Sequence, residues 1–363
     1  MKNVCVIIKN NTENLFLNET AIVVDVFSSR GYDFDEICLL RLDGSSAFID
    51  RIQSLKNTAI LLILAPKETL VSVREKLSQV FGAETVKAEG IYDDGNRTAF
   101  VLTEDEGATG AKYAREVCIP YLERKNALRR ERLCIKTVGA NPTRLNGLLA
   151  QLRENYAKEI SVRHTRRHGE DVIALRYDDR TPKMRIDDAL RLLAQGLDDS
   201  IYALEDISLE EQLVRLLKLR RKKISVAESF TGGGIARRIV SVAGASAVYF
   251  EGLNTYNERS KIRRLGVSEQ TLKTLGAVSD KTAYEMALGL LKTNECDLSI
   301  ATTGLAGPKA DAFGQPVGLC YIAVGTKEKI FVYRYQFDGT RKEITEKAIN
   351  YGLFLAYKTL KNT

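Results

Sequence analysis

Ala227-Glu-Ser-Phe-Thr-Gly-Gly-Gly234 joins a short apolar run, Ile224–Ala227, to residues 232–242, which have helical periodicity. We interpret this segment as a strand that turns into a helix. Three consecutive glycines let a ligand approach the backbone closely, and a helix N-terminus offers unpaired N–H groups to an anion. A tight turn capped by Ser or Thr has the same pattern, so the segment alone leaves a phosphate site and a structural turn equally open.

The sequence around this segment alternates between strand-like and helix-like runs, which predicts an α/β sheet. We expect strands at 248–256 and 298–302, a hairpin of 317–324 with 330–336, and helices at 279–291 and 341–360. Ser208-Leu-Glu-Glu211 has the form of a capping box at a helix start. The boundary of a C-terminal domain, residues 207–363, is therefore placed there.

Two further domains are expected upstream. In residues 1–126, buried strands are predicted at 4–8, 59–64 and 98–102, and helices at 19–30, 46–55 and 69–81, which favours a mainly parallel sheet. Residues 127–206 read as a small α+β sandwich, with strands at 133–138, 160–163, 172–177 and 201–204 and helices at 146–157 and 185–197. This second region lacks the GxxG clamp that nucleic-acid-binding proteins of similar shape use.

Composition excludes several classes of function. The chain has an apolar fraction of 44% and a charged fraction of 28%, which are typical of a globular protein. No secretory signal or membrane-length apolar run is present, so we expect a cytoplasmic protein. Its six scattered cysteines and two histidines, His164 and His168, predict neither a disulfide framework nor a His/Cys zinc site. No metal and no cofactor are expected.

The net charge of +7 comes partly from basic clusters such as Arg220-Arg-Lys-Lys223. Clusters of this kind can bind phosphate, nucleic acid or acidic protein. Because glutamates and leucines are interleaved with them, solvated helix faces are the preferred interpretation, and nucleic acid is a less favoured partner.

Several polar residues stand near the ends of the predicted strands. Ligands of open α/β sheets gather outside the carboxyl ends of strands, and Ser229, Tyr256 and Thr303 are at or just after such ends. Ser246 stands at the mouth of the strand that leads to Tyr256, and Lys261 is in the helix that follows. Taken singly, each residue is better explained as a turn, interface or surface residue, but their shared placement favours a site.

Seven segments in this order and spacing resemble the C-terminal domain of the CinA family of competence/damage-inducible proteins. They are AESFTGGG, GASAVYFEG, TYNERSK with RRLGV, LGAVSD, TTGLAGP, QPVGL and FDGTR, over about 150 residues. The resemblance implies a nicotinamide-nucleotide amidohydrolase that converts nicotinamide mononucleotide and water to nicotinate mononucleotide and ammonia, in pyridine nucleotide salvage. It also implies a homodimer. A non-catalytic nucleotide-binding scaffold, linked to competence or DNA damage, is the alternative.

The resemblance further implies the roles of individual residues. Because the C-terminal domain has no histidine, a Ser–Lys pair is expected, with Ser246 preferred over Ser229 as nucleophile and Lys261 as base. Lys261 must be neutral, which requires burial or a nearby positive group such as Arg341. Tyr256 would stack on the pyridine ring or relay a proton. Further amide, oxyanion and phosphate contacts are expected from Ser229, Thr303, Thr231, Gly232, Gly233, Gly234, Gly304 and Arg341.

The chain departs from the family pattern in the C-terminal domain at Phe230, usually Cys, at Glu258, usually Asn, and in the loop Lys309–Gln315. Upstream, a weaker resemblance implies a domain related to molybdopterin-binding proteins (MoaB/Mog-like) and then a KH-like domain. The first of these usually carries GGLGPTxDD, where this chain reads Leu64-Ala-Pro-Lys-Glu-Thr-Leu-Val-Ser72. Relatives with that signature hydrolyse ADP-ribose, so we expect this activity to be absent and the domain to be architectural.

Overall fold

The structure is a computed structural model that describes residues 1–8, 18–40, 47–55, 57–82, 85–88, 90–103, 107–308 and 314–362. The chain divides into two compact units, one of Met1–Arg132 with Arg176–Thr181, the other of Leu133–Leu175 with Pro182–Thr363. Among the described residues, no helix combines the length and hydrophobicity that a membrane-spanning segment needs.

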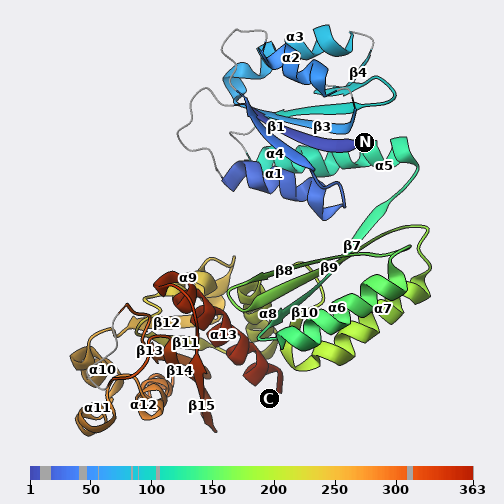
Figure 1. The fold of residues 1–363 in the computed structure, drawn as a ribbon. Helices are drawn as coiled ribbons and strands as arrows, with labels where there is room; N and C mark the ends of the chain where they lie inside the picture. Colours follow the sequence, from blue (N-terminus) through green and yellow to red (C-terminus); the bar gives the residue numbers. More distant parts are fainter. Residues whose placement is uncertain are drawn as a thin grey trace. The chain divides into compact units, whose positions relative to one another are not determined.

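The first unit is built on a six-stranded sheet of order β2-β1-β3-β6-β5-β4, and helices such as α1 and α3 flank it (Figure 1). The first four strands in this order are parallel and the last two pair antiparallel, which confirms the mainly parallel sheet. The bounds are β1 (Lys2–Ile8), β2 (Glu36–Leu40), β3 (Thr58–Ala65), β4 (Val86–Ala88), β5 (Ile91–Asp93) and β6 (Thr98–Thr103).

Helices cover both faces of this sheet, so β3 is buried on both sides. Leu62 and Leu64 pack with Phe27 and other residues of one core, whereas Leu61 and Ile63 pack with Ile52 and a second core on the opposite face. The bounds are α1 (Asn18–Ser29), α2 (Ala47–Ser54), η1 (Lys67–Thr69), α3 (Leu70–Phe81), α4 (Gly107–Tyr113), η3 (Ala114–Cys118) and α5 (Ile119–Asn126).

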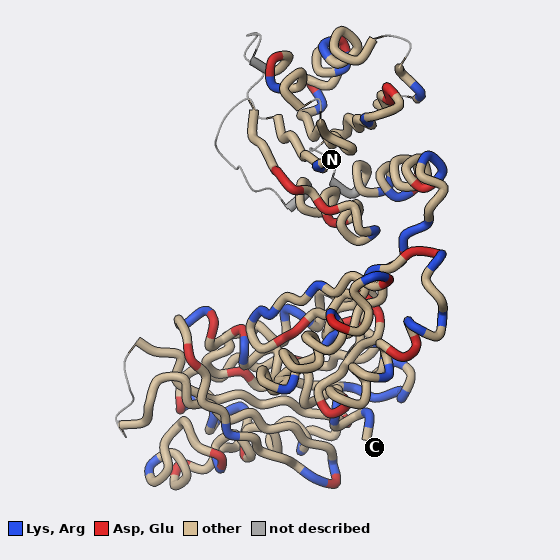
Figure 2. Tube along the Cα trace, turned by 45° about the vertical axis from the view of Figure 1, so that its right-hand side comes forward, with Lys and Arg blue, Asp and Glu red and all other residues tan. Residues whose placement is uncertain are grey.

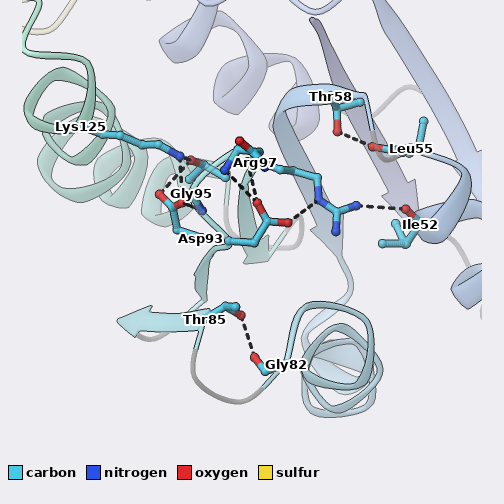
Figure 3. A network of polar contacts seen from close by, with 12 residues as sticks. Ile52, Leu55, Thr58, Gly82, Thr85, Asp93, Gly95, Arg97 and Lys125 are labelled. Atoms are coloured by element: carbon cyan, nitrogen blue, oxygen red, sulfur yellow. Dashed lines mark hydrogen bonds and ion pairs between the residues drawn. The ribbon is translucent and has the colours of Figure 1, made fainter.

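A buried polar network fixes the turn between β5 and β6 (Figure 3). Asp93 accepts hydrogen bonds of 2.8 Å from Lys125 Nζ, the Gly95 N–H and Tyr121 Oη. Burial would raise the pKa of Asp93, but these hydrogen bonds hold it below its ordinary value. Since every contact of the carboxylate is internal to the fold, the network is structural.

The second unit contains two sheets. Its first sheet has the order β10-β7-β9-β8, and α6 and α7 pack against each other beside it (Figure 1). The predicted series of strand, helix, two strands, helix and strand is confirmed. The bounds are β7 (Arg130–Val138), α6 (Pro142–Tyr156), β8 (Ser161–Arg167), β9 (Glu170–Asp178), α7 (Lys183–Leu197), η4 (Asp198–Ser200) and β10 (Ile201–Ala203).

The C-terminal sheet has the order β12-β11-β13-β14-β15. The first three strands are parallel, and the last two form the predicted antiparallel hairpin. The bounds are β11 (Ile224–Glu228), β12 (Tyr249–Asn254), β13 (Leu298–Gly304), β14 (Leu319–Thr326) and β15 (Ile330–Gln336).

Helices again cover both faces of the C-terminal sheet. One core contains Leu213, Ile235 and Leu353 from α8, α9 and α13, and another contains Leu265 and Met286 from α10 and α12. The predicted capping box of Ser208 and Glu211 opens α8. The bounds are α8 (Leu209–Arg220), α9 (Gly234–Val240), η5 (Ala245–Ala247), α10 (Glu258–Leu265), α11 (Glu269–Leu275), α12 (Asp280–Leu291) and α13 (Arg341–Asn362).

Basic and acidic residues are interspersed along both units (Figure 2). Some of the basic residues have acidic partners: Arg129 pairs with Glu131 at 3.2 Å, and Arg166 pairs with the buried Asp171 at 2.7 Å. The three sheets follow the order of the three expected domains, although the compact units number two. The domain boundaries at 126 and 206 stay predictions.

Candidate functional site

The site is centred on Ser229, the first residue after β11. The Ser229 N–H donates to the Thr302 carbonyl at 3.0 Å, which extends the pairing of β11 with β13 by one residue. The serine is 7% exposed. Its hydroxyl is therefore held at the carboxyl end of two parallel strands, where open α/β sheets bind their ligands.

Lys261 supplies the partner of this serine. The side chain is fully buried, and its Nζ donates to Ser229 Oγ at 3.0 Å, to the Thr255 carbonyl at 2.7 Å and to the Tyr256 carbonyl at 3.2 Å. Burial lowers the pKa of Lys261 to about 8, against the opposing charge of Glu258. Burial rather than Arg341 thus meets the requirement that this amine lose its proton easily.

The three contacts determine what the neutral amine can do. Carbonyl oxygens only accept hydrogen bonds, so the contacts with Thr255 and Tyr256 must each use one N–H of Lys261. A neutral amine has two N–H groups and one lone pair. The lone pair then faces Ser229 Oγ, and the serine hydroxyl becomes the donor. This is the arrangement of a general base beside a nucleophile.

Ser246 does not belong to this pair. It lies in η5, is exposed, and precedes β12. Because β11 and β12 are parallel, with Ile224 opposite Tyr249 and Glu228 opposite Asn254, Ser246 is at the amino end of the sheet and Ser229 at the carboxyl end. In the described structure Lys261 contacts Ser229 rather than Ser246, so the geometry favours Ser229 over Ser246 as the partner of this lysine, and the identity of the nucleophile stays a prediction.

The glycine-rich turn is filled by a carboxylate of the chain itself. Glu228 is 1% exposed, and its two oxygens accept from the N–H groups of Gly233, Ile235 and Ala236 at 2.9–3.1 Å. The N–H groups of Gly232 and Gly234 donate to the carbonyls of Ser229 and Thr231. These donors already have acceptors, which disfavours Gly232–Gly234 as a phosphate site.

Sequence reasoning missed Glu228. The available signal was an acidic residue at the end of a short apolar strand, one position before the turn, where a carboxylate can accept from the first N–H groups of the next helix.

Tyr256 and Arg341 come together at the surface. Arg341 Nη2 lies 3.5 Å from Tyr256 Oη, and Arg341 Nη1 donates to the Gly307 carbonyl at 2.6 Å. The Tyr256 side chain is 64% exposed, while its carbonyl contacts the buried Lys261 amine. The break between β12 and α10 therefore places Tyr256 next to Lys261 through its backbone and directs the ring outward.

Thr303, Gly304 and Thr231 are held by internal contacts. Thr303 Oγ1 donates to the Ala277 carbonyl at 2.6 Å, and the hydroxyls of Thr231 and Thr302 are 2.7 Å apart. A Cβ at Gly304 would lie 2.5 Å from Cys320 Cβ and 2.9 Å from the Phe230 ring. Phe230 belongs to the core, so this departure from the family pattern adds no bulk at the surface. Residues 309–313 of the variable loop lie outside the described residues.

The two cysteines of the C-terminal domain are buried. Burial raises the pKa of the Cys320 thiol to about 12 and also raises that of Cys296, so neither is a ready thiolate. In the part of the chain that the structure describes, no group of three His, Cys, Asp or Glu side chains converges as metal ligands would.

Comparisons with known proteins agree with the sequence resemblance. Residues 206–360 match the model of the CinA C-terminal domain. A putative competence-damage inducible protein of Caldicellulosiruptor saccharolyticus is 36% identical over 257 residues, 68% of this chain and 61% of the relative. A protein of the same description from Clostridium beijerinckii is 41% identical over 181 residues, 48% of this chain and 44% of the relative.

The crystal structure of competence damage-inducible protein A from Klebsiella pneumoniae is 31% identical, with 42% of this chain and 95% of that chain covered and a TM-score of 0.41. The matched part of this chain spans less than two thirds of the length of the curated relatives named above. The chain belongs to the CinA family.

Proposed function

We propose that the C-terminal domain hydrolyses the carboxamide of a pyridine nucleotide, converting nicotinamide mononucleotide and water to nicotinate mononucleotide and ammonia. The observation that carries the proposal is the buried Lys261 amine, 3.0 Å from Ser229 Oγ and with a pKa lowered to about 8. This geometry supports acyl transfer to a serine, and the choice of nucleotide rests on the family resemblance.

The reaction follows from the positions of two side chains. Neutral Lys261 takes the Ser229 proton while Oγ attacks the carboxamide carbon, and the carbonyl π electrons move to oxygen. When the tetrahedral intermediate collapses, the C–N bond breaks and Lys261 returns the proton to the leaving nitrogen, which departs as ammonia. Water, deprotonated by Lys261, then attacks the Ser229 ester. As the ester C–O bond breaks, Lys261 returns this proton to Ser229 Oγ, and the acid leaves as the carboxylate after losing its proton to solvent.

Tyr256 and Arg341 would hold the substrate. Because Glu228 occupies the glycine turn, Arg341 is the remaining predicted phosphate ligand, and its exposed guanidinium suits a phosphate. The exposed Tyr256 ring beside it offers a stacking surface for the pyridine. Thr303 donates its hydroxyl proton to Ala277, so toward a substrate amide its oxygen could only accept.

The test is ammonia release from nicotinamide mononucleotide by wild type, Ser229→Ala and Lys261→Ala, with Ser246→Ala as the matched control. We expect both site variants to lose roughly a thousandfold or more in kcat and Ser246→Ala to keep wild-type activity. Loss of activity with Ser246→Ala alone would contradict the assignment of the nucleophile.

The alternative is a non-catalytic nucleotide-binding scaffold acting in competence or the response to DNA damage. It is favoured by the names of the curated relatives, which describe competence-damage inducible proteins and specify no reaction. Thermal stabilisation of the wild type by nicotinamide mononucleotide without ammonia release would support this alternative. A homodimer in the cytoplasm remains our expectation under both proposals, and sedimentation velocity tests the oligomeric state.

We also propose that the N-terminal region is a degenerate relative of molybdopterin-binding domains and the middle region a KH-like domain. Where the diphosphate-binding signature is expected, β3 runs directly into Pro66 and the single turn Lys67–Thr69. This segment has no glycine and lacks the acidic pair. The full chain should not hydrolyse ADP-ribose with Mg²⁺ or another divalent ion, and measurable turnover would contradict this proposal.

A further inference from the structure

Most backbone N–H groups around Ser229 have an acceptor within the fold. Those of Ser229, Gly232, Gly233, Gly234, Ile235 and Ala236 each donate to a named acceptor: a carbonyl of Thr302, Ser229 or Thr231, or a carboxylate oxygen of Glu228. In this run of the described chain, only the N–H groups of Phe230 and Thr231 have no acceptor among the described residues.

These two donors are the central residues of a turn. The Gly232 N–H donates to the Ser229 carbonyl at 3.1 Å, which closes a turn from Ser229 to Gly232. In such a turn the bond is made by the first and fourth residues, so the N–H groups of the second and third are left for other partners. Phe230 is 7% exposed and Thr231 4%, and buried backbone donors without acceptors are rare.

Thr302 holds this turn at two points. Its carbonyl accepts the Ser229 N–H at 3.0 Å, and its Oγ1 lies 2.7 Å from Thr231 Oγ1. Thr302 is itself fully buried in β13, the strand next to β11 (Figure 1). The hydroxyl pair therefore fixes the Thr231 end of the turn to a rigid strand, while Glu228 fixes the residues that follow.

We propose that the N–H groups of Phe230 and Thr231 form the oxyanion hole of the Ser229 site, and that Thr231 and Thr302 are positioning residues that hold them in place. The inference rests on the proposed function. In serine hydrolases whose nucleophile follows a strand, the N–H of the next residue is such a donor. Here the negative charge that develops on the carboxamide oxygen would be stabilised by two donors that the fold has left without an acceptor.

The first test compares kcat and KM for ammonia release from nicotinamide mononucleotide. Thr231→Val and Thr302→Val keep the side-chain shape and remove one hydroxyl each. Each should lower kcat roughly tenfold to a hundredfold with little change in KM, because the hole acts only in the transition state. The double variant should be no worse than either single one, since one interaction is lost in all three.

Two further variants separate positioning from general damage. Thr231→Ser restores the hydroxyl and should recover most of kcat. Thr271→Val removes a buried hydroxyl of α11 that donates to Glu285 Oε1 at 3.0 Å, away from the site, and should keep wild-type kcat. Unchanged kcat in Thr231→Val, or equal loss in Thr231→Ser, would overturn the proposal.

A second measurement uses the mononucleotide whose carboxamide is replaced by an aldehyde. Ser229 Oγ would add to the aldehyde carbon to give a hemiacetal whose oxygen sits where the oxyanion forms. Thr231→Val should bind this analogue more weakly by about the same factor as its loss in kcat/KM, with unchanged affinity for nicotinate mononucleotide. Equal affinity for the analogue in both proteins would overturn the oxyanion hole alone. A wild type that neither releases ammonia nor binds the analogue would overturn the proposed function and this inference with it.

Discussion

Lys261 Nζ and Ser229 Oγ are 3.0 Å apart although 32 positions separate the two residues in the sequence. The parallel pairing of β11 and β12 explains the approach, because both residues follow the carboxyl ends of neighbouring strands. The Thr255 N–H donates to the Glu228 carbonyl at 2.8 Å and continues this pairing to the start of α10. Lys261, in the first turn of α10, is fully buried and donates to Ser229 Oγ.

The activity should depend on pH through Lys261. The pKa of this amine is lowered to about 8, and only its neutral form can take the Ser229 proton. We expect kcat/KM to rise about tenfold per pH unit below 8 and to level off above it, so that the value at pH 7 is about one tenth of the plateau. A profile that is flat between pH 6 and 9 would argue against Lys261 as the base.

Glu258 should influence the pH at which kcat/KM rises. Its carboxylate opposes the effect of burial and raises the pKa of Lys261. Glu258→Gln removes the charge, so the rise in kcat/KM should move to lower pH and the rate at pH 7 should increase. Glu328→Gln, at an exposed position on the turn between β14 and β15, is the control and should leave the profile in place. A shift of the Glu258→Gln profile to higher pH would contradict this role.

Burial of the Lys261 amine should also lower the free energy of unfolding at pH values where the amine is charged. Between pH 8 and 10.5 the unfolded chain keeps a proton on Lys261 that the folded protein has lost, so the free energy of unfolding of wild type should rise with pH. The rise is on the order of 3 kcal/mol and is absent below pH 8, where both states are protonated.

Lys261→Met removes this dependence. Its stability relative to wild type should therefore be greatest below pH 8 and should decline as pH approaches 10.5, while activity is lost. Urea unfolding at several pH values measures the difference, with Lys273→Met on the exposed face of α11 as the control. A constant difference between Lys261→Met and wild type across this window would mean that the Lys261 pKa is not lowered by folding.

Glu228 should hold the turn of the active site. Glu228→Gln replaces one accepting oxygen by an NH₂ group that would face backbone N–H donors, at a cost of about 1–3 kcal/mol in the free energy of unfolding. Glu251→Gln, a half-buried glutamate of β12, should change stability by no more than about 0.5 kcal/mol. Equal stability of Glu228→Gln and wild type would show that the carboxylate does not cap α9.

Most elements were predictable from the sequence because their apolar patterns are strong. The buried run of β3 and the amphipathic α6 and α7 are examples. The apolar patterns did not predict β2, whose exposed Ile37 and Leu39 alternate at a sheet edge, or the three-residue β4 and β5. Strands of three to five residues carry little hydrophobic signal, and neighbours elsewhere in the chain decide whether they form.

The site was predicted in part. Ser229 and Tyr256 follow strand ends as expected, and Lys261 lies in the helix after β12, but the roles of these residues stay predictions. Strand direction disfavours the preference for Ser246, because a residue that precedes a parallel strand lies at the sheet edge opposite the carboxyl ends, where Ser229 lies. The sequence pattern suggested a phosphate site at the glycine turn. Pattern alone does not show that Glu228 already accepts hydrogen bonds from the N–H groups there.

The central claim is that Ser229 carries the acyl group, and mass spectrometry of the acid-quenched enzyme tests it most directly. Wild type is mixed with nicotinamide mononucleotide, quenched within the first turnovers and digested, and the modified peptide is sequenced. We predict an ester of nicotinate mononucleotide on Ser229 that disappears when hydroxylamine is added and is absent in Ser229→Ala. An ester on Ser246, or ammonia release with no ester on any residue, would contradict the account.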